Sequence, residues 1–237
     1  MRLLQFPAAL LLAGAVLSSC DEEGICLKGV GDVETRTLQL DAFHGVEVNG
    51  STKVYVERGP TQKVEVKGQA NILDELETDV DDGIWHIEFD RCLRKHKTVE
   101  VYITLPDLDY AEVSGSGLMS WQDTFDADNF QARVSGSGEL TGPVAANQVT
   151  ARISGSGAIN LSGTAQDQDI AISGSGNLRA FGLQTKTTEV DVSGSGNAEV
   201  TTSDVLDVNI SGSGRVYYQG NPTVNADISG SGKVIKK

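Results

Sequence analysis

Apolar and polar residues alternate strictly around a Ser-Gly-Ser-Gly motif that occurs seven times between residues 114 and 232. Successive copies start 18 to 21 residues apart. In every copy, the residues four and two places before the first glycine and two places after the second glycine are apolar. Alternation with a period of two is typical of a strand with one buried face. The pattern therefore predicts a strand through each motif, with both glycines facing inward and both serines facing outward.

The repeat also predicts how the strands are arranged. One copy has too few inward apolar residues to form a core, whereas stacked copies would form one. Identical register in each copy favours an all-β parallel solenoid, or β-helix, of about seven coils spaced about 4.8 Å apart. Phe125, Val144 and Leu183 each lie eleven residues before the next first glycine, which indicates a second inward column on a return leg. An antiparallel meander with two strands per period remains an alternative.

The N-terminal part of the chain has a related pattern. Residues 45–57, GVEVNGSTKVYVE, follow the same template with Thr52 in place of the second glycine, so we interpret them as a degenerate copy. Further strands are expected at 62–67, 84–89 and 98–105, and a helical turn at 72–77. We expect this part to cap one end of the solenoid. At the other end, Lys233, Lys236 and Lys237 are expected to discourage edge-to-edge pairing of strands.

The first residues have the features of an export signal. Arg2 precedes an apolar run to Leu17 that is too short to span a bilayer comfortably. The ending Leu17-Ser18-Ser19-Cys20 resembles the bacterial lipoprotein processing box, which implies acylation of Cys20, for example by palmitate, and attachment to a membrane. An ordinary signal peptide with a chance cysteine is the alternative. The expected divisions are 1–19 (signal peptide), 20–33 (anchor and linker), 34–108 (N-terminal β region) and 109–237 (repeat solenoid).

Charge narrows the choice of partners. The formal net charge of −14 makes nucleic-acid binding improbable. Asp21-Glu22-Glu23 follow Cys20 directly. In enterobacteria, Asp at this place retains a lipoprotein in the inner membrane, whereas in Bacteroidetes acidic residues there accompany export to the surface. We expect a location in the cell envelope, with the outer membrane or cell surface favoured and the periplasmic face of the inner membrane as the alternative.

Two cysteines remain after Cys20. An exported chain enters an oxidising compartment, so we expect Cys26 and Cys92 to form a disulfide. Two free buried thiols are the alternative. A metal site would need further Cys or His ligands at a recognisable spacing, and the sequence has none. We expect neither a metal nor a cofactor.

The sequence contains no strong candidate for a catalytic or ligand-binding site. Acidic residues cluster in the turn at 123–128, where a solvated turn is favoured over weak Ca²⁺ binding. The basic patch at 91–97 is interpreted as a solvated loop, with an anionic partner as the alternative. No histidine lies beside an obvious nucleophile. Among the aromatic residues, Trp121, Tyr217 and Tyr218 are the candidates for lining a surface. Tyr218 shares the inward phase of Val216 and is expected in the core, whereas Tyr217 is expected at the surface. The residues weighed are Asp123, Asp126, Asp128, Arg91, Arg94, Lys95, His96, Lys97, His44, His86, Trp121, Tyr217 and Tyr218.

The glycines of the motif are expected to be structural. Ser-Gly-Ser-Gly lacks the Lys-Ser/Thr of a phosphate-binding loop, and no helix follows it. We expect the glycines to permit a close approach or a bend of the backbone in each coil. They are Gly115, Gly117, Gly136, Gly138, Gly155, Gly157, Gly174, Gly176, Gly194, Gly196, Gly212, Gly214, Gly230 and Gly232.

Together, the lipoprotein box, GVEVNGSTKVYVE, VYITLPDLDYAEVSGSG and the repeats resemble the head GIN domain family of bacterial exported proteins, labelled auto-transporter adhesins. The resemblance extends from about Glu34 to Val234. It implies a β-solenoid-like fold but little about activity, and it supplies no catalytic residues to carry over. We expect a non-enzymatic, lipid-anchored adhesin-like protein or interaction scaffold with a surface, glycan or protein partner; its oligomeric state is left open. The alternatives are a β-helix carbohydrate-active enzyme or glycan-binding module, and an accessory protein of an envelope sensor.

Overall fold

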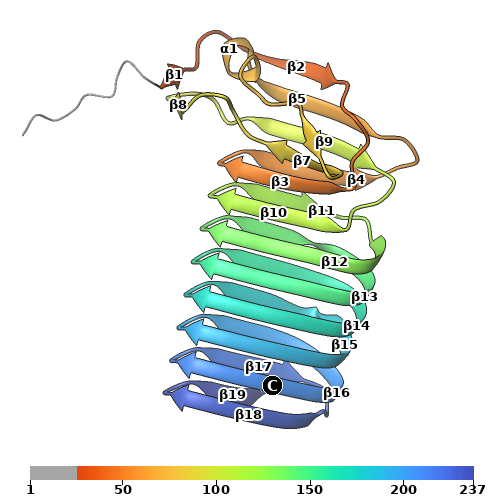
Figure 1. Cartoon of the computed structure of the whole chain (residues 1–237), viewed down its shortest axis with the longest axis vertical. Helices are drawn as coiled ribbons and strands as arrows, with labels where there is room; N and C mark the ends of the chain where they lie inside the picture. Colours follow the sequence, from red (N-terminus) through yellow and green to blue (C-terminus); the bar gives the residue numbers. More distant parts are fainter. Residues whose placement is uncertain (1–25) are drawn as a thin grey trace, which may run out of the picture.

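The structure is a computed structural model that describes residues 26–237; the expected signal peptide and Cys20 lie outside the described residues. Strands stack from top to bottom in one long column (Figure 1). Among the described residues the one helix, α1 (Ala70–Leu73), has four residues, so no helix there is long enough to cross a membrane. The all-β expectation is confirmed.

The repeats form the lower part of the column as parallel coils. They comprise β10 (Tyr110–Gly115), β11 (Leu118–Trp121), β12 (Phe125–Gly136), β13 (Glu139–Gly155), β14 (Ala158–Gly174), β15 (Asn177–Gly194), β16 (Asn197–Gly212), β17 (Arg215–Gln219), β18 (Thr223–Gly230) and β19 (Lys233–Lys236). Each coil runs along one side of the stack, turns, and returns along the other side (Figure 1). Neighbouring coils pair in parallel with like residues in register, as Ser154 with Ser173 and Gly155 with Gly174. This pairing excludes the antiparallel meander for the repeats.

Stacking produces continuous columns of buried side chains. Val134, Ile153 and Ile172 lie directly above one another and are at most 3% exposed. Phe125, Val144 and Leu183 on the return leg are fully buried, which confirms the second inward column. Since each coil buries its apolar residues against the next, the core extends through the whole stack.

The degenerate copy is the first coil. Its strands are β3 (Gly45–Gly50) and β4 (Lys53–Arg58). β3 pairs in parallel with β10, placing Gly50 beside Gly115, and β4 pairs in parallel with β11. Thr52 is 3% exposed at the position of the second glycine. The prediction of an additional coil before the first Ser-Gly-Ser-Gly motif is confirmed.

A change of strand direction closes the upper end of the stack. β7 (Ile84–Ile87) and β9 (Glu100–Leu105) still pair in parallel with β3 and β4. β5 (Lys63–Gln69) then pairs antiparallel with β9, and β2 (Val33–Leu38) antiparallel with β5. β6 (Val80–Asp81) pairs with β7, and β1 (Leu27–Lys28) with β8 (Leu93–Arg94). We call residues 26–44 and 59–108 the cap; the expected helical turn at 72–77 is observed earlier, at Ala70–Leu73.

The Ser-Gly-Ser-Gly motifs form corners between strands. The expectation that both glycines face inward is therefore wrong for the first glycine. Each strand ends at the first glycine, whose φ is between +112° and +130° in the seven copies. A Cβ atom on Gly155 would lie 2.6 Å from the carbonyl oxygen of Gly136 in the preceding coil, so this glycine faces along the stack. A Cβ atom on Gly157 would lie 2.4 Å from Cγ1 of buried Val134. Only the second glycine faces inward, because positive φ at the first interrupts the alternation.

Candidate functional site: a serine-lined groove along the solenoid

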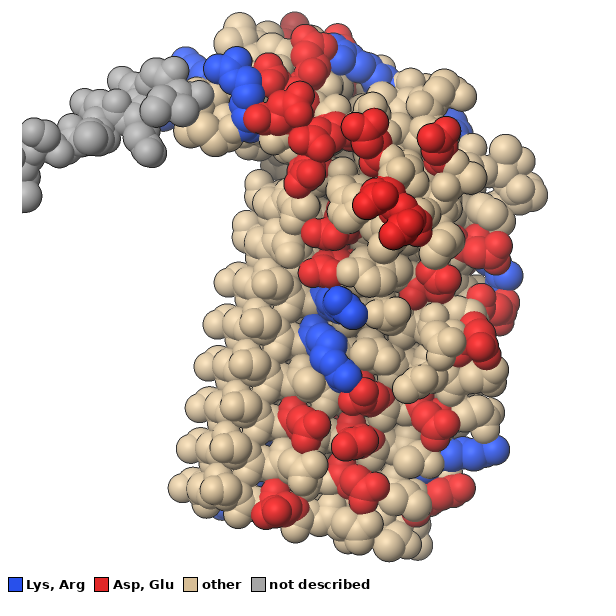
Figure 2. Space-filling view, viewed as in Figure 1, with Lys and Arg blue, Asp and Glu red and all other residues tan. Residues whose placement is uncertain are grey.

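Serine hydroxyls line one corner of the solenoid, once before and once after the first glycine of each motif. In Figure 2 this corner is the uncharged margin at the left, with one projection for each coil. The backbone N–H of the second serine donates to the carbonyl oxygen of the first glycine in the preceding coil, as from Ser156 to Gly136 at 2.8 Å. The corner therefore has a hydrogen-bonded backbone and outward side chains.

A groove of about 590 Å³ runs beside this corner along the outer face of β10, β12–β16 and β18. We call it the serine groove. Its lining combines six first serines of the motifs with the outward residue three places before each first glycine, namely Glu112, Arg133, Arg152, Ala171, Asp191, Asn209 and Asp227. The strand residues between them also contribute, namely Val134, Ile153, Ile172, Val192 and Ile210. These seven residues lie in register on successive coils. Every coil from β10 to β18 thus contributes to one continuous groove.

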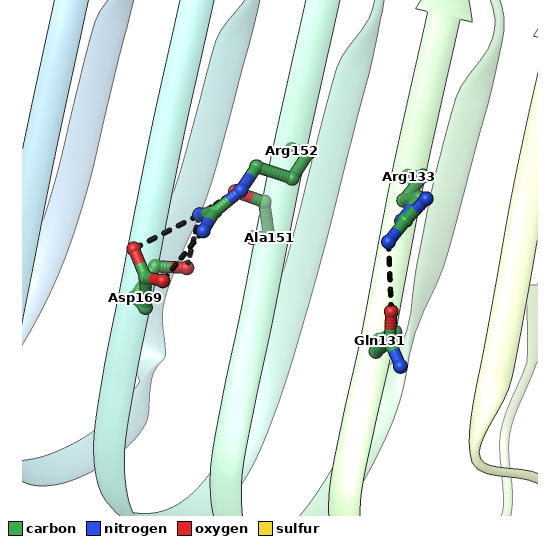
Figure 3. A network of polar contacts seen from close by, with 5 residues as sticks. All are labelled: Gln131, Arg133, Ala151, Arg152 and Asp169. Carbon is green, nitrogen blue, oxygen red and sulfur yellow. Dashed lines mark hydrogen bonds and ion pairs between the residues drawn. The ribbon is translucent and has the colours of Figure 1, made fainter.

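Two arginines occupy neighbouring places in the groove (Figure 3). Arg152 on β13 reaches across to β14, where Nη1 and Nη2 donate to Oδ1 and Oδ2 of Asp169 at 2.9 and 2.5 Å. Nη1 also donates to the carbonyl oxygen of Asp169 at 3.1 Å. Bonding to Asp169 raises the pKa of Arg152. The two parallel bonds hold the guanidinium group in one orientation.

Arg133 is held by different partners. Its Nη2 donates to Oε1 of Gln131 at 3.0 Å, and its guanidinium carbon lies 5.6 Å from the centre of the Tyr110 ring. The Tyr110 hydroxyl donates in turn to the carboxylate of Glu112. Burial, followed by this bond, raises the pKa of Tyr110 well above its usual range. The hydroxyl therefore stays protonated as a donor to Glu112.

The lower half of the groove is acidic. Asp191 accepts a hydrogen bond from Asn209 Nδ2 at 2.9 Å, and Asp207, just outside the lining, accepts one from Asn225 at 2.7 Å. In Figure 2 two blue side chains lie between red ones above and below. The lining as a whole has two arginines and three carboxylates, so its charge is mixed.

The acidic turn holds strands together through hydrogen bonds. Asp126 accepts a bond from Arg58 at 2.9 Å, and Asp128 one from Asn147 at 2.5 Å. The Asp123 carboxylate accepts a bond from the backbone N–H of Arg58 at 3.0 Å. Within residues 26–237, no group of three or more His, Cys, Asp or Glu side chains is placed to hold a metal ion.

The histidines and the basic patch lie in or beside the cap. His44 is 2.6 Å from Asp109, and His86 is 3.0 Å from Glu47. Arg94 Nε donates to the carbonyl oxygen of Cys26 at 3.1 Å, so the basic patch contributes to the packing of the first described residues. Other contacts of the patch join His96 Nδ1 to the carbonyl oxygen of Lys97 at 2.7 Å, the Lys97 N–H to Oε1 of Gln69 at 2.8 Å, and Arg91 to Glu75 at 3.7 Å.

Among the aromatic residues, Trp121 differs from the sequence expectation, whereas Tyr218 agrees with it. Trp121, expected near a surface, is 3% exposed, and its Nε1 donates to the carbonyl oxygen of Pro143 at 2.9 Å. Tyr218 packs partly buried against the core, and Lys237 lies over the ring of Tyr217 at 4.9 Å. None of these three lines the serine groove.

Cys26 and Cys92 are joined by a disulfide in the structure. The bond joins the start of the described chain to β8 in the cap, beside the backbone hydrogen bond from Leu27 to Cys92. The disulfide closes a loop of 66 residues that contains most of the cap. It fixes Cys26, the first described residue, to the upper end of the stack.

Sequence reasoning found the serines and glycines but missed the groove. Six of the seven outward residues that lie three places before a first glycine are polar, and a strand pattern assigns such residues simply to solvent. The available signal was their shared position, three places before each first glycine. Only the stacking of coils shows that this position forms a continuous line.

The fold and groove define a β-solenoid repeat protein with a long lateral surface, a form that commonly serves binding. The family model "Putative auto-transporter adhesin, head GIN domain" matches residues 42–222, and the chain belongs to this family. The adhesin-like character of the family indicates an exported protein of the cell surface or envelope. A search of curated proteins gives no significant match.

Solved structures share the fold. A putative adhesin from Bacteroides fragilis NCTC 9343 has a TM-score of 0.79 at 20% identity, covering 89% of this chain and 100% of that one. A putative lipid binding protein from Parabacteroides distasonis ATCC 8503 has a TM-score of 0.74 at 23% identity, covering 89% and 99%. A putative adhesin from the same strain has a TM-score of 0.73 at 25% identity, with the same coverage.

Proposed function

We propose that this protein is a non-enzymatic, lipid-anchored adhesin of the cell envelope that binds its partner in the serine groove. One observation carries the proposal: an open groove of about 590 Å³ whose lining repeats on every coil from β10 to β18. Parallel stacking makes this surface stiff, and Arg133, Arg152 and the Asp191–Asn209 pair already have fixed partners, so little conformational entropy is lost on binding. Membership of the adhesin-like family supports the same role.

Anchoring through Cys20 would determine which end of the solenoid lies nearer the membrane. Cys26 is only six residues after Cys20 and is fixed to the cap by its disulfide with Cys92. Six residues reach about 20 Å when fully extended. An acylated Cys20 thus holds the cap close to the membrane, while the coils extend away from it.

Whole cells test the proposal. Cells that produce the full chain are treated with a protease that cannot enter them, and their attachment to host cells or extracellular matrix is measured. We expect the protein to be cleaved and attachment to fall with it. A Cys20→Ser variant should leave the membrane fraction, with loss of attachment. Protection from the protease in intact cells, combined with cleavage after lysis, would place the protein inside the envelope and contradict adhesion.

A further inference from the structure

The shape of the serine groove limits what can occupy it. The lining continues through seven coils, over a length of about 29 Å at the usual spacing of neighbouring strands. Each coil contributes one outward side chain, and six of the seven coils add a serine beside it. At the centre, Ala171 leaves the groove unobstructed between Arg152 and Asp191. Such a lining suits a linear chain lying along the solenoid axis better than a compact molecule.

The charges of the lining limit the chemistry of that chain. A polyanion would be attracted to Arg133 and Arg152 but would meet Asp191 and Asp227 further along. A polycation would be attracted to Asp191 and Asp227 but repelled by Arg133 and Arg152. Because neither sign is favoured along the whole groove, the matching polymer is uncharged.

The hydrogen-bonding groups identify the kind of uncharged polymer. Serine hydroxyls both donate and accept, and Arg152, Asn209 and Asp191 add planar donors and acceptors, which together suit a ligand with many hydroxyl groups. An extended peptide fits less well, since it binds at sheet edges and advances about 3.3 Å per residue, which does not match the coils. An extended β-1,4-linked pyranose chain advances by about one coil spacing per sugar. Each sugar would then lie beside one coil, and every second sugar would present the same edge to the groove.

Resting on the proposed function, we propose that the ligand of the serine groove is an uncharged linear β-linked polysaccharide, which lies along the solenoid axis with about one sugar per coil. Arg152, held by Asp169, and Arg133, held by Gln131, supply oriented N–H donors at its upper part (Figure 3). Asp191 and Asn209 supply paired acceptor and donor groups at its lower part.

Chain length gives the first test. The full-length protein is titrated by calorimetry with cello-, manno- and chito-oligosaccharides of two to eight sugars. For at least one series, we expect affinity to rise with each added sugar and to level off at about seven, the number of coils in the groove. An affinity that is already maximal for a disaccharide would show a compact site and contradict the proposal.

A matched pair of variants on one strand locates the site. Ala171→Arg places a long side chain in the middle of the groove, whereas Ala158→Arg places it on the other outward side of β14. Both residues are partly exposed on the same coil, so thermal unfolding should show similar stability. We expect Ala171→Arg to weaken oligosaccharide binding tenfold or more and Ala158→Arg to leave it unchanged. Equal binding by the two variants would exclude the groove.

The outcomes separate this inference from adhesion itself. If cells attach in a manner that requires the protein, but no uncharged oligosaccharide binds, the ligand class is wrong and the adhesin role stands. If the purified protein binds oligosaccharides with the expected length dependence but cells do not attach through it, the ligand class stands and the adhesin role is wrong.

Discussion

At the scale of single residues, the first glycine of each motif is the most constrained position in the repeat. Its φ is positive, and a Cβ atom there would come within 2.4 to 2.6 Å of a carbonyl oxygen in the coil before. Side chains other than glycine strain this backbone conformation, and the neighbouring carbonyl belongs to a hydrogen-bonded corner that cannot move away easily. The serines on either side carry no such restriction.

Gly155→Val should therefore destabilise the protein strongly. We expect a loss of about 3 kcal/mol or more in the free energy of unfolding, from overpacking combined with backbone strain. Ser154→Ala, one residue away and exposed, should change it by less than about 0.5 kcal/mol. Urea unfolding of both variants measures the difference. A Gly155→Val protein with the stability of the parent would show that the corner can adopt another geometry.

An ion pair in the cap should make stability depend on pH. Lys67 Nζ lies 2.8 Å from Glu100 Oε2, and this bond lowers the pKa of Glu100 in the folded protein. A lowered pKa means that the carboxylate contributes stability above about pH 4.3, its ordinary value, and that this contribution disappears as the pH falls through the lower folded value. The effect is small, since the pair is partly exposed and screened by salt.

Glu100→Gln provides the measurement. We expect the parent to be more stable than the variant at pH 6, with the difference shrinking steadily below pH 4 in unfolding experiments at low salt. Glu57→Gln, at an exposed position on the adjacent strand β4, is the control for a general loss of negative charge. A stability difference that stays constant from pH 6 to pH 3 would show that the pair does not contribute through its charge.

At the scale of elements, the cap and the coils are stabilised in different ways. Coils bury apolar columns against identical neighbours in parallel register. The cap changes from parallel to antiparallel pairing at β9 and β5 and adds a disulfide. A solenoid end leaves strand edges and apolar side chains uncovered, so the cap acts as a terminal repeat that closes the stack.

The disulfide should stabilise the cap. Closing a loop of 66 residues corresponds to about 4 kcal/mol in the chain-entropy description. The variant Cys26→Ser, Cys92→Ser should unfold at a lower urea concentration, and hydrogen exchange should increase in β2, β5 and β9 before it increases in β13–β16. Intact mass with and without reductant, after alkylation, reports the bond directly. An unchanged mass after reduction and alkylation would show that the thiols do not form this bond.

At the scale of the whole molecule, the solenoid is nearly one-dimensional. Each long strand pairs mainly with the strand before and the strand after it, as β14 does with β13 and β15. The stability of such a stack is approximately the sum of coil and interface contributions. The length of the serine groove therefore follows directly from the number of coils.

Deletion of one complete coil should leave a folded protein. Removing residues 156–174 joins Gly155 to Ser175 and restores the motif with its register intact. We expect a cooperative transition at reduced stability and, for the proposed ligand, a plateau in affinity one sugar shorter. Removing residues 156–175 joins Gly155 to Gly176 and loses a serine of the corner, so it should unfold or aggregate. Equal behaviour of the two deletions would contradict the importance of register.

Local pattern in the sequence determined the all-β class, the parallel stack and the degenerate first coil at 45–57. The reason is that a fixed repeat carries register and period together, so each inward Val or Ile predicts the next column. The same reasoning failed at the first glycine, because alternation assumes an uninterrupted strand, whereas φ at Gly155 is +114°. It also failed at Trp121, which is buried although the sequence suggested a surface.

The groove is visible only in the tertiary structure. Glu112, Arg133, Ala171 and Asp191 are each an ordinary outward residue of a strand in the sequence. Parallel stacking places them on one line beside the serine corner, and contacts across coils, such as Arg152 with Asp169, fix their orientations. Side-chain alternation within one strand determines which face a residue lies on, but a continuous binding surface arises only between strands that are far apart in the chain.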